Sequence, residues 1–280
     1  MGDTGPILGS IHGRKPEEFA VFSRLLGQKR SREVLPSTGG RLVYAVGDVH
    51  GRLDVLQMLV RDIANDVLAT RPPERPVLIF LGDYVDRGPD SRGVVDLILT
   101  LKSDPAFDVT VLKGNHEEAL MQFVQDPGFG STWLDHGGGA TLAAYGVQPP
   151  STRMDSDTWA ATRDALNAAL PASHRAFYQQ LELMRVVGDY AFVHAGVRPG
   201  VALEDQSERD LLWIRHEFIR DRGPFGKVIV HGHTPSEEAQ LTPCRIGIDT
   251  GAYATGVLTA VRLYGDSQSL IQARSQRRIG

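Results

Sequence analysis

Short apolar runs rich in β-forming residues alternate with stretches of helical periodicity along much of the chain. Leu42–Val46 is such a run and ends at Gly47, and Leu53–Ala69 then places apolar residues at the 3.6-residue spacing of a helix packed on a sheet. The same order recurs twice, with strands predicted at 77–81 and 109–112 and helices at 91–101 and 117–125. Three consecutive strand–helix units predict a parallel sheet with right-handed crossovers.

The ends and the centre of the chain depart from this pattern. Residues 1–40 are interpreted as an N-terminal extension, with an amphipathic stretch at Pro16–Gln28 that predicts a docking helix. One main domain is expected over 41–265, with 128–185 as an inserted helical cap, although plain helical packing explains that segment equally well. Residues 266–280 are expected to form a solvated, basic C-terminal tail. Four later β-rich runs predict a second, more antiparallel sheet: 190–193, 228–230, 246–248 and 256–263.

The composition narrows the class of protein. The chain has 280 residues, of which 41% are hydrophobic and 23% charged, as in ordinary globular proteins. Its formal net charge of −4 argues against a general nucleic-acid binder, since such affinity comes from neutralising phosphates. No apolar run approaches the ~18 residues of a membrane span, and the single cysteine, Cys244, favours a reducing compartment. We therefore expect a cytoplasmic protein without a nucleic-acid or membrane partner.

Polar side chains gather in the loops that follow the predicted strands. In open sheets, side chains just past the carboxyl ends of parallel strands face one crevice. These loops supply oxygen and nitrogen donors and no thiolate: Asp48, His50, Asp83, Asn115, His194 and His233. Such donors suit Mn²⁺, Fe or Zn²⁺. Because one ion does not need all of them, we expect two divalent ions ~3.5–4 Å apart, a pair that promotes in-line displacement on phosphate esters.

The spacing and order of the loops carry a family resemblance. The matching segments are 47–51 (GDVHG), 82–88 (GDYVDRG), 114–117 (GNHE), 194–196 (HAG), 212–215 (LWIR) and 231–234 (HGHT). This set resembles the phosphoprotein phosphatase family of calcineurin-like metallophosphoesterases, in its bacterial or bacteriophage-type serine/threonine protein phosphatase form. The resemblance implies an α/β fold, a β-sandwich flanked by helices, with a dinuclear metal centre at one edge. It also implies hydrolysis of phosphomonoesters on a phosphoprotein or phosphopeptide, with manganese as the first expectation for the ions.

The resemblance assigns a ligand set to each ion. For the first ion the implied ligands are Asp48, His50 and Asp83. For the second ion they are Asp83, Asn115, His194 and His233. The shared Asp83 would bridge the two ions, and a hydroxide between them would be the nucleophile.

The resemblance also assigns residues to the substrate. His116 would protonate the leaving alkoxide as general acid, and Asp86 would orient it. Arg87 and Arg215 would grip the phosphate oxygens, since guanidinium groups suit that geometry, and Asn115 would contact the phosphate as well.

Other functions remain as alternatives. A symmetrical diadenosine tetraphosphate hydrolase shares most of these motifs but departs from aspartate at the position of Asp86. The histidine segment 194–196, in contrast, slightly favours this hydrolase. A metal-stabilised binding module would lack the acid and the arginines, and a nuclease fits the acidic net charge poorly. The oligomeric state is left open.

Three neighbouring polar residues have structural explanations. Glu117 fits charge complementarity at a helix N-terminus, and Asp249 fits a turn at the end of a strand. His231, two positions before His233, is left open between packing and metal binding.

Overall fold

The computed structural model describes residues 1–2, 35–151 and 155–275. By its internal contacts the chain divides into Met1–Leu35 and Pro36–Gly280. The docking helix predicted at Pro16–Gln28 lies outside the described residues. Within the described ranges, no helix is both long and apolar enough to cross a membrane.

The first sheet is built on the three predicted strand–helix units. Its strand order is β10–β9–β1–β2–β3, in which β1, β2 and β3 are parallel and β9 and β10 antiparallel. The strands are β1 (Leu42–Val46), β2 (Val77–Phe80), β3 (Asp108–Val111), β9 (Val257–Tyr264) and β10 (Ser267–Arg274). The helices that follow the parallel strands are α2 (Leu53–Thr70), α3 (Ser91–Ser103) and α4 (Asn115–Gln125). The predicted parallel arrangement is therefore confirmed.

The second sheet differs from its prediction in two respects. Its order is β4–β5–β6–β8–β7, with parallel pairing from β5 to β6 and from β6 to β8. The strands are β4 (Met184–Val187), β5 (Tyr190–Val193), β6 (Val228–His231), β7 (Gln240–Leu241) and β8 (Arg245–Gly247). The expectation of a more antiparallel sheet was thus wrong, because the two central pairings are parallel. The run 256–263 was also misplaced, because β9 pairs with β1 in the first sheet.

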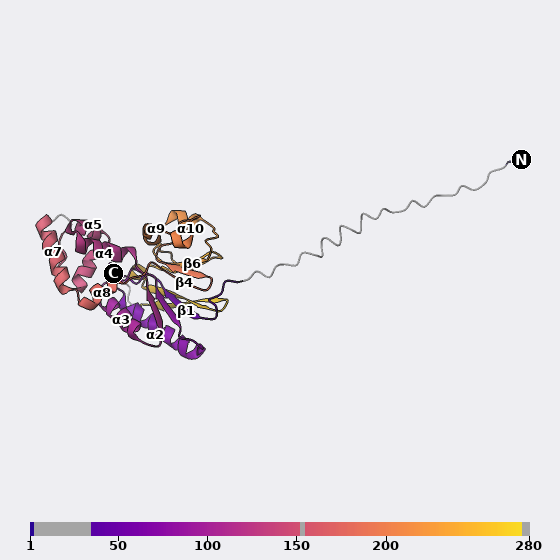
Figure 1. Ribbon diagram of the computed structural model, residues 1–280, viewed down its shortest axis with the longest axis horizontal. Helices are drawn as coiled ribbons and strands as arrows, with labels where there is room; N and C mark the ends of the chain where they lie inside the picture. Colours follow the sequence, from indigo (N-terminus) through magenta and orange to yellow (C-terminus); the bar gives the residue numbers. More distant parts are fainter. Residues whose placement is uncertain (3–34, 152–154, 276–280) are drawn as a thin grey trace. The chain divides into compact units, whose positions relative to one another are not determined.

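The two sheets face each other as a sandwich, and helices cover both outer sides. Leu42, Tyr44 and Val46 of β1 belong to the core beneath the helices, whereas Val43 and Ala45 belong to the core between the sheets. Burial on both faces explains why this strand is a continuous apolar run. Figure 1 shows α2 and α3 on the side of the first sheet, and α9 (Glu208–Trp213) and α10 (His216–Arg220) on the side of the second.

The segment predicted as a helical insertion consists mainly of helices between β3 and β4. They are η1 (Pro127–Phe129), α5 (Gly130–Asp135), α6 (Gly138–Ala144), α7 (Ser156–Ala169) and α8 (Ala172–Gln179). Within the unit Pro36–Gly280, helices α5, α7 and α8 lie together with α4 on one side (Figure 1). The short elements η2 (Leu203–Asp205) and α11 (Ala252–Thr255) complete the described fold.

Both predicted boundaries of the main domain were too narrow. At its start, the Ser37 N–H donates to the Asp189 carboxylate, and the Thr38 N–H donates to the Gly265 carbonyl. At its end, Ser267–Arg274 forms β10 and pairs with β9 along eight residues, so it is a strand and not a tail. These segments are largely polar, and apart from Thr38 and Ala273 their residues are exposed or only partly buried. The hydrophobic pattern therefore gave no indication of them.

Candidate metal centre

The candidate site lies where the parallel strands of both sheets end. The loops after β1, β2 and β3 come from the first sheet, and the loops after β5 and β6 come from the second. The carboxyl ends of parallel strands share one edge of their sheet. The two sheets thus bring together the polar loops on which the prediction rested.

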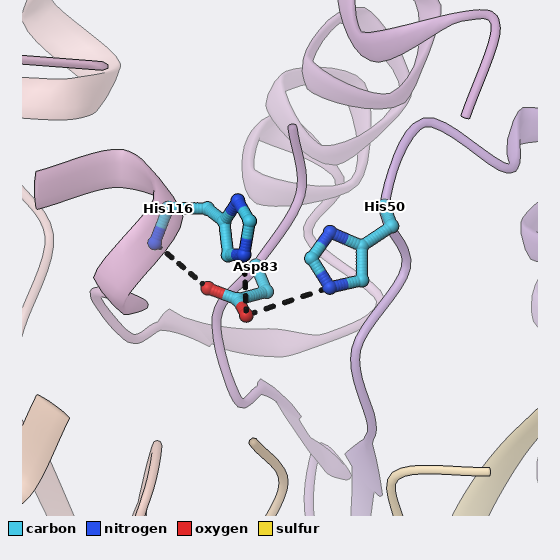
Figure 2. A group of neighbouring side chains, drawn as sticks. All are labelled: His50, Asp83 and His116. Atoms are coloured by element: carbon cyan, nitrogen blue, oxygen red, sulfur yellow. Dashed lines mark hydrogen bonds and ion pairs between the residues drawn. The ribbon is translucent and has the colours of Figure 1, made fainter. Parts of the chain in front are cut away.

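Asp83 lies at the centre of this cluster. Its Oδ2 is 3.5 Å from His50 Nε2 and 3.9 Å from His116 Nε2, and its Oδ1 accepts from the His116 backbone N–H at 3.0 Å (Figure 2). Oδ1 is also 3.5 Å from His194 Nε2. Asp83 consequently belongs to two groups with metal-ligand spacing, one with His50 and His116 and one with His194 and His233. A carboxylate shared by two such groups has the placement needed to bridge two cations.

Two imidazoles meet at the Asn115 side chain. Its amide oxygen is 2.9 Å from His194 Nε2 and 2.8 Å from His233 Nδ1. His194 Nδ1 is 3.0 Å from the Leu81 carbonyl, which can only accept, so Nδ1 carries the proton in the neutral ring. The lone pair of Nε2 then faces the Asn115 oxygen, and a cation bound by both atoms would make this arrangement favourable.

A backbone carbonyl also fixes the tautomer of His50. Its Nδ1 is 2.9 Å from the Val85 carbonyl, so Nε2 is the atom left to bind a cation or to accept a hydrogen bond. Burial lowers the pKa of His50 to about 3 and that of His233 to about 2, and it also lowers the pKa of His194. These rings are therefore neutral, and each has a nitrogen lone pair that can bind a metal ion.

The surroundings of Asp48 also indicate whether these residues can bind a metal ion. Its side chain is buried, and its Oδ2 accepts from the His233 backbone N–H at 3.0 Å. Among the described residues, Asp48 Oδ1 and His233 Nε2 have no hydrogen-bond partner. A Cβ on Gly232 would lie 2.0 Å from Asp48 Oδ1, so only glycine fits there. Unpartnered buried oxygen and nitrogen atoms are what a divalent cation would satisfy.

The charges in the cluster support the same interpretation. Burial, together with Asp249 and Asp83, raises the pKa of Asp48 well above its usual value. Burial also raises the pKa of Asp249 to about 6. For Asp83, burial is outweighed by the surrounding histidines, which hold its pKa below the usual range. Crowded carboxylates of this kind become ionised when cations bind among them.

The predicted ligand sets correspond to the observed groups only in part. His50 lies with Asp83, and His194 and His233 lie with Asp83 on the other side. In the first group, however, His116 takes the place expected for Asp48. The ligation of a cation by any of these residues, Asp48 and Asn115 included, stays a prediction.

His116 also forms a buried pair with Asp86. His116 Nδ1 is 2.7 Å from Asp86 Oδ2, and the Asp86 side chain is fully buried. The same carboxylate accepts from Trp133 Nε1 at 3.0 Å and from Thr141 Oγ1 at 2.6 Å. Burial lowers the pKa of His116, but Asp83 and Asp86 outweigh it and raise the pKa above its usual value. This pair can hold a proton on Nε2, which faces the cluster.

The helices of the insertion therefore support the site. Trp133 belongs to α5 and Thr141 to α6, and both bind Asp86. The Arg87 N–H donates to the Gly137 carbonyl at 3.1 Å. Asp86 and Arg87 have φ angles of 71° and 66°, which non-glycine residues adopt only when their surroundings enforce them. No periodicity links these residues, so sequence reasoning missed both Trp133 and Thr141.

The two predicted phosphate-binding arginines lie in different surroundings. Arg87 is exposed, donates to His50 Nε2 at 3.0 Å, and its guanidinium group is 4.7 Å from the Tyr253 ring centroid. Arg215 lines a pocket of about 420 Å³ together with Trp213. The Trp213 ring is 6.3 Å from the His233 ring, and Trp213 Nε1 donates to Glu118 at 2.6 Å.

Glu117 is a functional support that sequence reasoning reduced to a helix-terminus charge. Its buried carboxylate accepts from the backbone N–H groups of Asp83, Tyr84 and Gly114 at 2.8–3.0 Å. It thus fixes the loop that presents Asp83, whose φ is 53°. Burial and the Asp83 carboxylate raise the pKa of Glu117 to about 8, so cations nearby would favour its ionised form.

His231 and Asp249 have structural roles in the described fold. The His231 ring packs against Phe218 at 5.0 Å, burial lowers its pKa to about 4, and it belongs to neither metal-ligand group. This favours packing over metal binding. Asp249 accepts from the Gly251 N–H at 2.8 Å, which is the expected turn.

Comparison with known proteins places the chain in a family. A family model described as calcineurin-like phosphoesterase matches residues 42–256. The chain belongs to the calcineurin-like phosphoesterase family. The match covers both sheets except β9 and β10, and it includes all the loops that form the candidate metal centre. The predicted fold class, a helix-flanked β-sandwich, is confirmed.

Individual relatives differ in their described activities. The chain is 27% identical over 232 residues to a serine/threonine-protein phosphatase 1 of Salmonella typhimurium, covering 80% of this chain and 92% of the relative. It is 24% identical over 237 residues to an asymmetrical bis(5'-nucleosyl)-tetraphosphatase PrpE of Anoxybacillus flavithermus, covering 78% and 88%. A solved structure of a candidate diadenosine tetraphosphatase shares the fold, with a TM-score of 0.57 and 21% identity over 84% of this chain and 95% of that one.

Membership of this family shows that the chain is a phosphoesterase, which is a hydrolase, and implies that it binds divalent metal ions. The donor set described above fits them. The alternative weighed from the sequence was a symmetrical dinucleoside tetraphosphatase, whereas the PrpE relative is of the asymmetrical type.

Proposed function

We propose that this phosphoesterase is a metal-dependent serine/threonine protein phosphatase. The observation that carries the proposal is the buried His116–Asp86 pair, 2.7 Å apart and held by Trp133 and Thr141. The 27% identical relative described as a serine/threonine-protein phosphatase supports it.

The metal ions, when bound, would neutralise phosphate charge and activate a water molecule for in-line attack. The residues proposed to hold them are Asp48, His50, Asp83, Asn115, His194 and His233. Manganese is the proposed metal for both positions. The cytoplasmic location expected from the single cysteine also stays a prediction.

The remaining residues act on the substrate. Arg87 and Arg215 bind the phosphate oxygens through their guanidinium groups, and the Asn115 amide contacts the phosphate beside them. As the bond between phosphorus and the serine or threonine side-chain oxygen breaks, His116 Nε2 gives its proton to that departing oxygen. Asp86, which accepts from Nδ1, keeps the ring oriented and stabilises its protonated form.

The type of leaving group explains why this pair favours a phosphomonoester. The alkoxide of serine or threonine is a strong base and leaves poorly without a proton. The nucleotide displaced from a dinucleoside tetraphosphate leaves through a phosphate oxygen as a stable anion, so its departure needs little acid catalysis. A rigid, buried acid pair is therefore of greater use for a phosphorylated side chain.

A second candidate is hydrolysis of a dinucleoside tetraphosphate. The PrpE relative favours it, since the match covers 88% of that protein. Trp213 is 39% exposed beside the site and offers a ring on which a nucleobase can stack.

A substrate comparison tests the proposal. The purified full chain, supplied with Mn²⁺, is assayed on phosphoserine, phosphothreonine and phosphotyrosine peptides and on diadenosine tetraphosphate. We expect the highest kcat/KM on the phosphoserine or phosphothreonine peptide. Preferential cleavage of the dinucleotide would overturn the proposal, and its products would show the type: two ADP for symmetrical cleavage, ATP and AMP for asymmetrical cleavage.

A further inference from the structure

A pocket of about 960 Å³ adjoins the candidate metal centre on its Arg87 side. Arg87 and Gly51 form part of its wall, and Leu53, Met58 and Pro89 add apolar surface. Gly51 directly follows the candidate ligand in the loop after β1. A substrate whose phosphate is bound by Arg87 would therefore have its neighbouring groups beside this pocket.

Arginines outnumber acids in the lining of this pocket. Its charged lining residues are Arg52, Arg61, Arg87, Arg274, Asp54 and Asp90. Asp54 is bound by Arg52 through two hydrogen bonds of 2.8 Å. Asp90 accepts from the Gly93 N–H at 2.8 Å and caps α3. Arg52 therefore neutralises Asp54, and three arginines remain in the lining against the single charge of Asp90.

Arg61 and Arg274 provide that excess away from the phosphate. Arg61 lies on α2 and is exposed, with its Nε 3.7 Å from the neighbouring Asp62. Arg274 ends β10, is exposed, and donates from one nitrogen to Gln272 at 2.8 Å. Guanidinium groups with exposed donors suit carboxylates, which they bind through two parallel hydrogen bonds.

We propose that this pocket binds the residues next to the phosphorylated residue of a protein substrate, and that Arg61 and Arg274 select acidic side chains there. The inference rests on the proposed protein phosphatase function. The mixture of apolar wall and arginine suits a peptide with acidic residues. As far as the chain is described, the pocket lining includes no aromatic ring on which a nucleobase could stack.

The test compares two phosphoserine peptides that differ only in whether the flanking residues are acidic or neutral. The measured quantity is the ratio of their kcat/KM values, which cancels changes in general activity. We expect the wild-type ratio to favour the acidic peptide. Exposed charge pairs are worth little, so Arg61→Gln and Arg274→Gln should each lower the ratio about 2- to 5-fold. Arg61→Glu with Arg274→Glu should reverse the preference.

Arg222→Glu is the matched control, because Arg222 is exposed and lies outside the pocket. It should leave the ratio unchanged. The wild-type preference should also weaken as salt is raised, because ions screen exposed charges. This second measurement requires no substitution and decides the question even if the double variant does not fold.

The possible outcomes distinguish a failure of the pocket assignment from a failure of the proposed protein phosphatase function. Equal kcat/KM for the two peptides, or a ratio insensitive to both arginines, overturns the pocket assignment alone. Loss of diadenosine tetraphosphate hydrolysis in the double variant with an unchanged peptide ratio assigns the pocket to a polyphosphate and also overturns it. Failure of the wild type to cleave either peptide overturns the proposed function and the inference together.

Discussion

Replacing Thr141 by valine tests whether the helical insertion is part of the catalytic site. The side chain is fully buried on α6, and valine has nearly the same shape. Its hydroxyl donates to Asp86 Oδ1 at 2.6 Å and accepts from the Asp86 N–H at 2.8 Å. Thr141→Val removes both bonds, together with the 3.1 Å hydrogen bond between Thr141 Oγ1 and Ser91 Oγ, and adds no bulk.

The magnitude follows from what each atom of Asp86 loses. The N–H keeps a second acceptor, Ser91 Oγ at 3.2 Å, so it remains partnered. Oδ1 loses a hydrogen bond to a buried carboxylate, and such bonds contribute about 1.5–3 kcal/mol. We expect a loss of that size from the free energy of unfolding, against a typical total of about 5–15 kcal/mol.

Urea unfolding of the metal-free proteins at neutral pH measures this loss, and Thr162→Val is the control. Thr162 is also buried, on α7, but its hydroxyl donates to the Thr158 carbonyl, which keeps its helical hydrogen bond. The control should lie within about 0.5 kcal/mol of the wild type. Steady-state kinetics with metal should show Thr141→Val losing more kcat on a phosphoserine peptide than on para-nitrophenyl phosphate. A Thr141→Val protein as stable and as active as the wild type would refute the role given to the insertion.

Two further predictions concern the metals and the stability of the fold. Asp83→Asn should weaken the binding of both proposed ions, because it removes the shared negative charge. Metal analysis after desalting should find less bound metal than in the wild type, for which we expect two ions, and retention of both ions would contradict the bridge. Burial raises the pKa of Asp66, but Tyr44 and Arg262 outweigh it and hold the pKa below its usual value. The stabilisation by Asp66 is therefore complete above the unfolded pKa of about 3.9 and is lost as the pH falls through the lower folded value. Asp66→Asn should flatten the pH dependence of the unfolding free energy in this range, and an unchanged profile would count against the assignment.

The sequence predicted the centre of the site because its signals are local. The apolar runs 42–46, 77–81, 109–112, 190–193 and 228–230 are each followed within three residues by a donor side chain. Parallel strands bring such ends together at one edge of a sheet. Asp83 therefore meets His50 on one side and His194 on the other, although more than 100 residues separate Asp83 from His194.

Other features depend on contacts that no local pattern encodes. Trp133 and Thr141 reach Asp86 across 47 and 55 residues, and neither stands in a motif. The β10 strand has few buried side chains because it lies at a sheet edge, so its sequence lacks the alternation that marks a strand. The run that became β9 was recognised as a strand, but its place depends on pairing with β1, about 200 residues away.

The central claim is that the His116–Asp86 pair supplies a proton to a poor leaving group. The direct measurement compares wild type and His116→Asn on a phosphoserine peptide and on para-nitrophenyl phosphate, with equal metal content confirmed in both proteins. We predict a loss of about 10²–10⁴ in kcat on the peptide. The loss on para-nitrophenyl phosphate should be much smaller, because its leaving group scarcely needs a proton. An equal loss on both substrates would contradict the claim and assign His116 to positioning or to metal binding.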